Sequence, residues 1–501
     1  DNWEQAAEIY RDFALTLPWS RKAKNRKNPA PWLKEEVGFC TFGINAGHDR
    51  SRWLKQYHED IQSPALHVLG PDWTNRPQTY GSGVPGGMAD WLPTRFNPHT
   101  LAAIRENGDR FAPFEFDFLV SLKQSDQQTL QDNLQRFPDP PCSHDGYKFN
   151  MLCPAQPFTK AFHRERDLQV AAESGADAMY YDISANNLIK ICTREDHAHT
   201  PGGGHEIARA YQDIYEDTAG ALREAVGRPI PLGTEQISEE LIAQVDFYQA
   251  RAWAQPAAIL ETWPFLAQMK TGQALMIPLF DYVYHDIGPL RMDGWGKLAE
   301  ETGELFYYTL AKVYLWGGIY QLNHEYSPME ALSGQENPPQ EHYFHFAPRG
   351  YAYSHKRARH LGLFASARLG DARRFWAYGR LLAAPEISLP RREYSWHNYN
   401  HAQQDDAAQT SGTYNAEAVF ISFWQAPDGD QALFLANCDS QEGHSIKLKE
   451  ASEALSGASV RLTRFDALGK ARVITDFGMA PLERPVVPEV YISIDGSPGS
   501  V

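Results

Sequence analysis

Between residue 35 and about residue 385, short apolar runs alternate with segments whose apolar positions follow helical spacing. This alternation is typical of parallel βα units. Nine runs are candidate strands, at residues 37–44, 65–69, 111–120, 147–153, 176–183, 230–233, 245–250, 274–283 and 318–322. A (β/α)8 TIM-type barrel has eight strands, so at least one of the nine lies elsewhere in the fold.

The clearest helix is predicted over residues 206–226, where Ile207, Tyr211, Ile214 and Leu222 share one side. Gly227 follows directly and is a typical helix terminator. Further helices are expected over 301–316 and over 355–384, the latter broken near Gly370. The first residues also show helical spacing, before a basic stretch and two prolines. We therefore expect residues 1–34 to form a helix and a linker that pack on the barrel.

After residue 385 the pattern changes to short β-rich runs separated by turn residues. They lie at residues 418–424, 431–437, 444–448, 459–465, 471–475 and 490–494. No long helix is expected between them, which indicates an antiparallel β-sandwich. The predicted organisation is thus residues 1–34, a catalytic barrel over 35–385, and a C-terminal sandwich over 386–501.

The composition narrows the classes of function. With 47 Lys and Arg against 63 Asp and Glu, the net charge is −16, which argues against binding a nucleic-acid backbone. No run approaches the roughly 18 apolar residues of a membrane span, so no membrane insertion is expected. Aromatic residues make up 12% of the chain, and such rings suit both a large core and the stacking of sugar faces.

The 501 residues include five cysteines, at positions 40, 142, 153, 192 and 438. They form no CxxC pair and are odd in number. Neither a disulfide framework nor a structural zinc site is therefore expected, although one disulfide remains open. No cofactor is expected.

Two carboxylates follow directly on apolar runs that are neighbours along the predicted barrel. Asp182 ends the run at 176–183, and Glu235 ends the next one after the intervening helix. In parallel barrels the active site lies at the carboxyl ends of the strands. Two carboxylates there can act on one glycosidic bond, one as nucleophile and one as acid/base. Each residue also suits an ordinary helix-capping role.

Other polar and aromatic residues near predicted strand ends are candidate contacts for a sugar. They are Asp72, Trp73, Trp263, Asp281, His285 and His324. Asp281 and His285 could contact a sugar hydroxyl or orient Asp182. The two tryptophans are placed in loops, where a ring can serve as a stacking platform or pack against its neighbours.

The segment from Asp196 to His205 contains an HxH pair and three consecutive glycines. His197, His199 and His205 could bind a metal together with Asp182, because HxH on an extended segment puts both imidazoles on one side. Alternatively, the glycines let a substrate approach the backbone closely, with His197 and His199 as substrate contacts. The segment is no P-loop, since no Lys-Ser/Thr follows the glycines.

Several motifs resemble a family of bacterial barrel proteins of glycoside-hydrolase type, distantly akin to endo-α-N-acetylgalactosaminidases. They are Trp3-Glu-Gln-Ala-Ala-Glu-Ile-Tyr-Arg-Asp-Phe-Ala14 with Pro18-Trp19, Tyr180-Tyr-Asp-Ile183, His197-Ala-His-Thr-Pro-Gly-Gly-Gly204, Gly233-Thr-Glu235 and Val283-Tyr-His-Asp286. The resemblance covers residues 1–385.

What the resemblance implies is a retaining hydrolase of α-linked sugars, with Asp182 as nucleophile and Glu235 as acid/base. Relatives commonly carry a large β-sandwich before the barrel, and this chain begins where that domain would end. Glu239 and Glu240 are rivals for the acid/base role.

The sequence thus predicts a glycoside hydrolase with a carbohydrate substrate. Two alternatives stay open: a metal-dependent hydrolase that uses His197, His199 and His205, and a non-catalytic carbohydrate-binding barrel. The oligomeric state is not determined by the sequence. The compartment is not fixed either, with a periplasmic or secreted location favoured over a cytoplasmic one.

Overall fold

The computed structural model describes most of the chain. The described residues are 2–26, 30–75, 84–122, 126–136, 150–185, 191–250, 275–296, 298, 300, 303–323, 353–397, 411–447, 459–465, 470–478 and 489–492. Among them, no helix is both long enough and apolar enough to cross a lipid bilayer.

Eight parallel strands close into a barrel in the order β1-β12-β11-β10-β9-β6-β3-β2. Their bounds are β1 Phe39–Ile44, β2 Ala65–Leu69, β3 Arg110–Phe116, β6 Met179–Asp182, β9 Leu232–Glu235, β10 Phe247–Gln249, β11 Leu290–Gly296 and β12 Ile319–Asn323. This confirms the predicted (β/α)8 barrel. Because β6 and β9 are adjacent, with Tyr181 opposite Thr234, the ends of these two strands meet.

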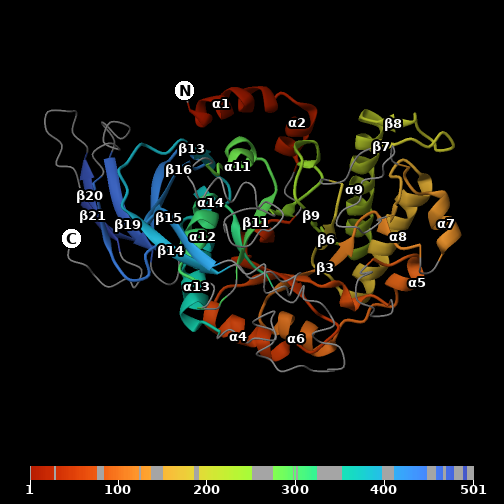
Figure 1. The fold of residues 1–501 in the computed structure, drawn as a ribbon, viewed down its shortest axis with the longest axis horizontal. Helices are drawn as coiled ribbons and strands as arrows, with labels where there is room; N and C mark the ends of the chain where they lie inside the picture. The colour runs from red at the N-terminus through yellow and green to blue at the C-terminus, as the bar shows by residue number, and fades with distance from the viewer. Residues whose placement is uncertain are drawn as a thin grey trace.

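The helices surround the barrel (Figure 1). They are α1 Trp3–Ala14, α2 Pro18–Asn25, α3 Trp32–Glu35, α4 Ser51–Ile61, α5 Met88–Trp91, α6 Pro98–Glu106, α7 Gln127–Asp132, α8 Pro157–Ser174, α9 His205–Val226, α11 Leu279–Tyr284, α12 Leu305–Leu315, α13 His355–Leu369 and α14 Arg373–Trp376, with the 3-10 turns η1 Pro71–Trp73 and η2 Glu239–Leu241. The predicted helix over 206–226 is α9, and Gly227 ends it with a left-handed φ of 74°. The break predicted near Gly370 separates α13 from α14.

Seven of the nine candidate strands are barrel strands, and two are not. In the run at 147–153, the described residues form only the two-residue strand β5 (Asn150–Met151), which pairs outside the barrel with β4 (Leu119–Val120). The described part of the run at 274–283 contains α11 instead of a strand. A short apolar run fits a buried helix as well as a buried strand, so periodicity alone cannot separate the two.

The barrel strand that the sequence does not reveal is β11. Arg291 and Asp293 interrupt the apolar pattern of this segment, so the pattern does not predict a buried strand. In the structure the Nη1 atom of Arg291 donates to Oδ2 of Asp281 on α11 at 2.8 Å. The strand therefore buries Arg291 by pairing it with the helix that precedes it, and only the tertiary structure shows this pairing.

The N-terminal helix α1 packs on α11. The ring of Trp3 meets that of Tyr282 edge-on, at 5.2 Å between centroids. Arg11, whose side chain is 7% exposed, bridges to Asp286 at 2.7 Å. Residues 2–14 are thus attached to the segment that leads into β11, near the start of that strand.

The C-terminal region contains only antiparallel pairings among its described strands. They are β13 Arg380–Leu382, β14 Arg391–His397, β15 Ser411–Glu417, β16 Val419–Gln425, β17 Gln431–Asn437, β18 His444–Lys447, β19 Ser459–Phe465, β20 Ala471–Gly478 and β21 Glu489–Ile492. They form the sheets β13-β16-β17, β14-β15, β18-β21 and β19-β20. The six predicted strands are present, and β13, which precedes residue 385, pairs with β16. That these sheets stack as a sandwich stays a prediction.

This region lies beside α12 and α14 (Figure 1). Trp424 of β16 is fully buried, and its indole Nε1 donates to the carbonyl of Leu315 at the end of α12 at 3.0 Å. The C-terminal sheets thus contact the barrel through a buried aromatic anchor.

A buried charge network lies between α8 and the strands β3 and β6. The Nε atom of Arg166 lies 2.8 Å from Oε2 of Glu115 and 2.8 Å from Oδ1 of Asp167. All three side chains are at most 1% exposed. Arg166 also donates through Nη1 to the carbonyl of Asp117 at 3.1 Å, so the network reaches the end of β3.

Replacing Arg166 by methionine is expected to lower the free energy of unfolding by about 3 to 5 kcal/mol, because Glu115 and Asp167 lose a buried partner. Urea denaturation followed by circular dichroism measures this. Arg164→Met is the matched control on the same helix, since Arg164 is 47% exposed and pairs loosely with Asp217 at 3.4 Å. It should change the same quantity by less than about 1 kcal/mol. Equal effects of the two variants would contradict a structural role for the buried network.

Candidate functional site

Asp182 and Glu235 lie at the carboxyl ends of the adjacent strands β6 and β9. Both are buried, with 8% and 0% of the residue exposed. The backbone N–H of Ile183 donates to Oε2 of Glu235 at 2.9 Å, and the hydroxyl of Ser184 donates to the Glu235 carbonyl at 3.0 Å. The amide of Ile183 directly follows the Asp182 Cα, so the Glu235 carboxylate lies against the backbone next to Asp182.

The backbone turns sharply after each of the two carboxylates. Ile183 has a φ of 47° and Gln236 a φ of 58°, both in the left-handed region. This conformation costs energy for residues with a Cβ, and a β-branched isoleucine is a genuine outlier there. The turn at Ile183 directs its N–H towards Glu235. The turn at Gln236 is held by its own N–H, which donates to the carbonyl of Gln249 at 2.8 Å.

A chain of polar side chains crosses the barrel beside Asp182. Tyr180 lies two residues before Asp182 and therefore faces the same side of β6. Its hydroxyl donates to Oε1 of Gln249 at 2.8 Å and lies 3.4 Å from Oδ1 of Asp182. The Gln249 amide then donates to Oε1 of Gln321 at 3.1 Å. None of these three residues is among the site residues predicted from the sequence, although a glutamine within an apolar strand run is a usable signal.

Below the carboxylates the barrel is filled by aromatic rings. Tyr180 meets Phe42 at 5.4 Å and Phe247 at 6.5 Å between centroids. Gly233 lies two residues before Glu235, and a Cβ there would come within 2.1 Å of the Phe247 ring. Glycine is thus required by the packing beneath Glu235.

Asp117 holds the backbone on both sides of Ile183. Its N–H donates to the carbonyl of Asp182 at 3.3 Å, and its Oδ2 accepts the N–H of Ala185 at 3.3 Å. The other oxygen lies 2.8 Å from Nε2 of His163, and the Tyr215 hydroxyl donates to Oδ2. Asp117 is 3% exposed. It is therefore a positioning residue for the Asp182 turn.

Asp72 and Trp73 lie in η1, just after β2. Oδ2 of Asp72 accepts the N–H of Gly47 at 2.8 Å. Burial raises the pKa of Asp72 to about 7, against the opposing effect of Arg50. Trp73 is fully buried, and its ring stacks on Phe96 at 5.1 Å. A stacking platform for a sugar needs an exposed ring face, so Trp73 is a core residue here.

The raised pKa of Asp72 predicts a pH dependence of stability. A carboxyl whose pKa is higher in the folded state penalises folding once the pH exceeds its unfolded pKa of about 3.9, and the penalty grows until about pH 7. Asp72→Asn removes this penalty. Relative to the unmodified protein, we expect the variant to gain stability between pH 4 and pH 7, by at most about 4 kcal/mol.

Urea denaturation at a series of pH values measures the difference. Asp12→Asn, which changes an exposed aspartate on α1, is the control and should give a difference that is flat with pH. A flat difference for Asp72→Asn as well would show that this carboxyl ionises normally in the folded protein.

Asp281 and His285 do not lie at the end of the barrel that carries Asp182 and Glu235. Asp281 is paired with Arg291, and burial raises its pKa to about 6. The Nδ1 atom of His285 lies 2.9 Å from the carbonyl of Gly379, and its ring meets Trp424 at 4.8 Å. Burial lowers the pKa of His285 to about 4. Since His285 follows α11 and precedes β11, it lies where that strand begins, whereas Asp182 lies where a strand ends.

Trp263 and His324 lie outside the described residues, so their predicted contacts with a sugar stay predictions. Glu239, a rival for the acid/base role, lies in η2, where its Oε2 accepts hydrogen bonds from the hydroxyls of Tyr10 and Tyr284. Those two residues belong to α1 and α11, away from Asp182.

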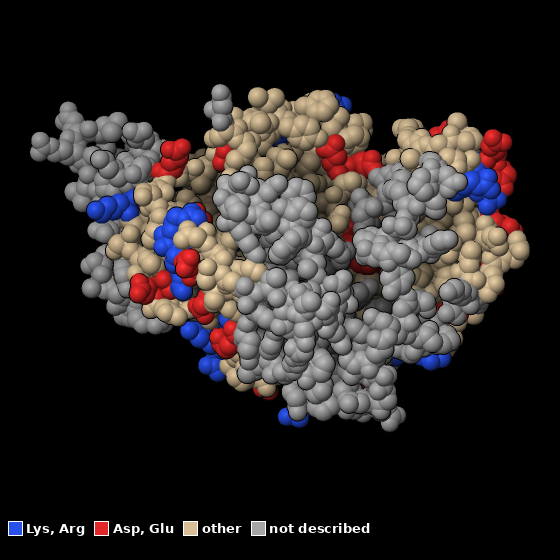
Figure 2. Space-filling model, viewed as in Figure 1, with Lys and Arg blue, Asp and Glu red and all other residues tan. Residues whose placement is uncertain are grey.

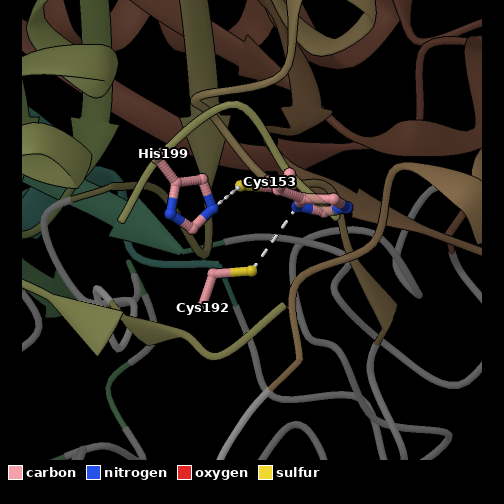
Figure 3. Close-up of side chains that lie close together, drawn as sticks. Cys153, Cys192 and His199 are labelled. Atoms are coloured by element: carbon pink, nitrogen blue, oxygen red, sulfur yellow. Dashed lines mark hydrogen bonds between the residues drawn. The ribbon is translucent and has the colours of Figure 1, made fainter. Parts of the chain in front are cut away.

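His199 turns towards Cys153, with Cys192 nearby (Figure 3). His197 lies beside Cys192 in the same cluster. Sγ of Cys153 lies 3.4 Å from Nε2 of His199, and Sγ of Cys192 lies 3.6 Å from Nδ1 of His197. The four side-chain donor atoms all lie within 4.8 Å of one another. His205, the third histidine of the predicted metal set, is exposed at the start of α9 and is not part of this cluster.

The comparison with protein families gives one match. The model of a family described as a domain of unknown function, DUF6259, matches residues 1–291. The chain belongs to this family. The match includes both strand-end carboxylates and the four-residue cluster. A comparison with curated proteins finds no match.

Solved structures with a similar fold include the α-N-acetylgalactosaminidase NagBb of Bifidobacterium bifidum. Its ligand-free form is 14% identical with a TM-score of 0.51, and the match covers 86% of this chain and 62% of that one. Its GalNAc complex is 13% identical with a TM-score of 0.52, covering 86% and 63%. The chain thus spans less than two thirds of that enzyme's length. At this identity the similarity shows the fold, a (β/α)8 barrel of the kind that this glycoside hydrolase has.

Proposed function

We propose that the protein is a glycoside hydrolase that cleaves α-linked sugars with retention of configuration. The observation that carries the proposal is the hydrogen bond from the Ile183 N–H to Glu235, which places the Glu235 carboxylate against the backbone next to Asp182 on the adjacent barrel strand. A retaining pair needs its carboxyl groups about 5 to 5.5 Å apart. Neighbouring strands lie about 4.8 Å apart, so side chains at adjacent strand ends are compatible with this spacing. The shared fold with an α-N-acetylgalactosaminidase supports the same activity class and makes α-linked N-acetylhexosamines the first substrates to test.

In the first step a carboxylate oxygen of Asp182 attacks the anomeric carbon. The glycosidic C–O bond breaks, and the carboxyl proton of Glu235 passes to the leaving oxygen, which departs as an alcohol. In the second step Glu235, now a carboxylate, takes a proton from water as the water oxygen attacks the same carbon. The ester bond to Asp182 breaks, and the sugar is released with its original configuration.

The surrounding residues support these two roles. The Ile183 N–H holds one oxygen of Glu235 and so fixes the direction of the carboxyl group. Tyr180 lies beside Asp182 and is itself oriented by Gln249. Asp117 holds the turn that follows the nucleophile. We propose Asp72 as a further contact for sugar hydroxyls, because η1 follows β2 at the same end of the barrel.

The metal-dependent alternative is not favoured by the described geometry. His197 and His199 face two cysteines, while His205 and Asp182 are not part of that cluster. A set of four protein ligands closes a tetrahedral site, whereas a catalytic metal keeps a position open for water. We also propose that the C-terminal strands form a β-sandwich that braces the barrel, consistent with the buried anchor at Trp424.

Digestion of a panel of α- and β-linked glycosides tests the activity. The panel includes aryl α-N-acetylgalactosaminides, aryl α-galactosides and natural oligosaccharides, and proton NMR follows the first anomer released. We expect hydrolysis of an α-linked substrate with the α-anomer released first. Release of the β-anomer would reject the double-displacement mechanism. Binding of a glycan without any product would instead favour a non-catalytic carbohydrate-binding barrel.

A further inference from the structure

Cys153, Cys192, His197 and His199 form a cluster that the proposed hydrolase mechanism does not use. We propose that these four residues bind a structural zinc ion. The first three are buried, and His199 is partly buried. Two thiolates and two imidazoles in a tetrahedral arrangement are a ligand set that favours zinc over harder cations.

The distances in the cluster fit a tetrahedral site. With zinc–sulfur bonds of about 2.3 Å and zinc–nitrogen bonds of about 2.0 Å, a sulfur and a nitrogen on one zinc ion stand about 3.5 Å apart. The two sulfur–nitrogen distances in the structure are 3.4 and 3.6 Å. The largest separation among the four donor atoms is at most 4.8 Å, so small side-chain movements suffice to close the site.

The second nitrogen of each histidine provides an independent observation. Nδ1 of His199 lies 2.8 Å from the carbonyl of Thr200, and Nε2 of His197 lies 3.3 Å from the carbonyl of Asp132. A backbone carbonyl only accepts, so each of these nitrogens carries the proton. The remaining nitrogen, Nε2 of His199 and Nδ1 of His197, then directs its lone pair into the cluster. Metal-binding histidines are typically oriented by such a hydrogen bond to their outer nitrogen.

The ligands come from two long connections at the carboxyl end of the barrel. Cys153 lies in the connection from β3 to α8, directly before the helix that carries Arg166 and His163. Cys192 lies in β7 (Ile191–Cys192), which pairs with β8 (Gly202–Gly203), and both histidines lie between these strands. This second connection starts at Ile183, next to Asp182. Zinc would thus join the two connections that flank the end of β6.

The sequence rule for structural zinc sites fails here for an identifiable reason. It looks for CxxC pairs, whereas these cysteines are separated by 38 residues, from position 153 to position 192. Because the barrel places the connections after β3 and β6 side by side, ligands far apart in the sequence converge.

Metal analysis of the full chain tests the proposal. The protein is purified under reducing conditions without added metal, and zinc is measured by mass spectrometry after exhaustive dialysis. We expect about one zinc per chain. Replacing zinc by Co²⁺ should give the visible absorption of tetrahedral cobalt, together with a thiolate-to-cobalt charge-transfer band.

Three variants locate the site. Cys192→Ser should lose at least nine tenths of the zinc. His199→Cys keeps four ligands and should retain zinc while it shifts the cobalt absorption towards that of a three-sulfur site, which guards against loss of metal by simple misfolding. His205→Gln is the matched control in the same loop and should keep zinc at the level of the unmodified protein.

The proposal is overturned by any of three results: a zinc content far below one per chain under reducing conditions, zinc retained in full by Cys192→Ser, or loss of zinc in His205→Gln. A disulfide between Cys153 and Cys192 in the protein as isolated, detected by mass spectrometry of an alkylated digest, would also overturn it. Because zinc content is read without any substrate, these outcomes do not depend on whether the proposed glycosidase activity is correct.

Discussion

Asp182→Asn is expected to lower kcat on the best α-linked substrate by about 10³-fold or more. The amide cannot form the covalent bond to the anomeric carbon, so the double displacement loses its first step. The side chain is nearly isosteric, and the turn at Ile183 is held by hydrogen bonds with Asp117 and Glu235. The variant should therefore fold as the unmodified protein does.

Steady-state kinetics with an aryl glycoside measure this loss, and thermal unfolding checks the fold. Asp196→Asn is the matched control, because Asp196 is an exposed aspartate that pairs with Arg194 in the loop before α9. It should leave kcat within about a factor of two, as expected for a surface substitution away from the site. If Asp182→Asn retained full turnover with an unchanged fold, Asp182 would not be the nucleophile.

Glu235→Gln should lower kcat by about 10²- to 10⁴-fold, with a size that depends on the leaving group. An alkoxide leaving group needs the proton that glutamine cannot give, whereas an activated phenolate departs without it. The loss should therefore be larger for natural oligosaccharides than for nitrophenyl glycosides. Added azide should restore turnover of the nitrophenyl substrate and yield a glycosyl azide of retained configuration, because azide attacks without a general base.

Glu239→Gln tests Glu239, one of the two rivals of Glu235, for the acid/base role. Glu239 accepts hydrogen bonds from Tyr10 and Tyr284, so its loss should affect stability modestly and leave the dependence on leaving group unchanged. If Glu239→Gln rather than Glu235→Gln showed the leaving-group dependence and the azide rescue, the acid/base role would pass to Glu239.

The distribution of surface charge bears on the class of ligand. On the face shown in Figure 2, basic and acidic side chains are interspersed over the described residues, without one extended basic area. This fits the net charge of −16, which argues against a nucleic-acid ligand.

The sequence is most informative where local chemistry decides the structure. Barrel strands that are largely apolar, such as β2 with His67 as its one polar residue, are predicted as buried parallel strands because both of their faces are covered. The helix α9 has an apolar stripe and a glycine at its end, so its bounds follow from its own residues. Asp182 and Glu235 stand out because a carboxylate that ends an apolar strand must face a site or a partner.

The sequence is less informative where a residue's role depends on a distant partner. Asp281 and His285 follow an apolar run as a catalytic group would, but that run contains α11, and their partners are Arg291 and the carbonyl of Gly379. Trp73 sits after a strand in a short turn, yet Phe96 covers its ring. In each case the role of the residue depends on a contact between distant segments, which a local sequence pattern does not show.

The sequence by itself determined the barrel, its general order and the two carboxylates, because strand periodicity and strand-end polarity are local properties. The tertiary structure alone decided that the Ile183 amide reaches Glu235, that β11 buries paired charges, and that Cys153 and Cys192 meet His197 and His199. These contacts arise when barrel closure brings separate βα connections together, and their sequence separation is set by loop length rather than by a repeating pattern.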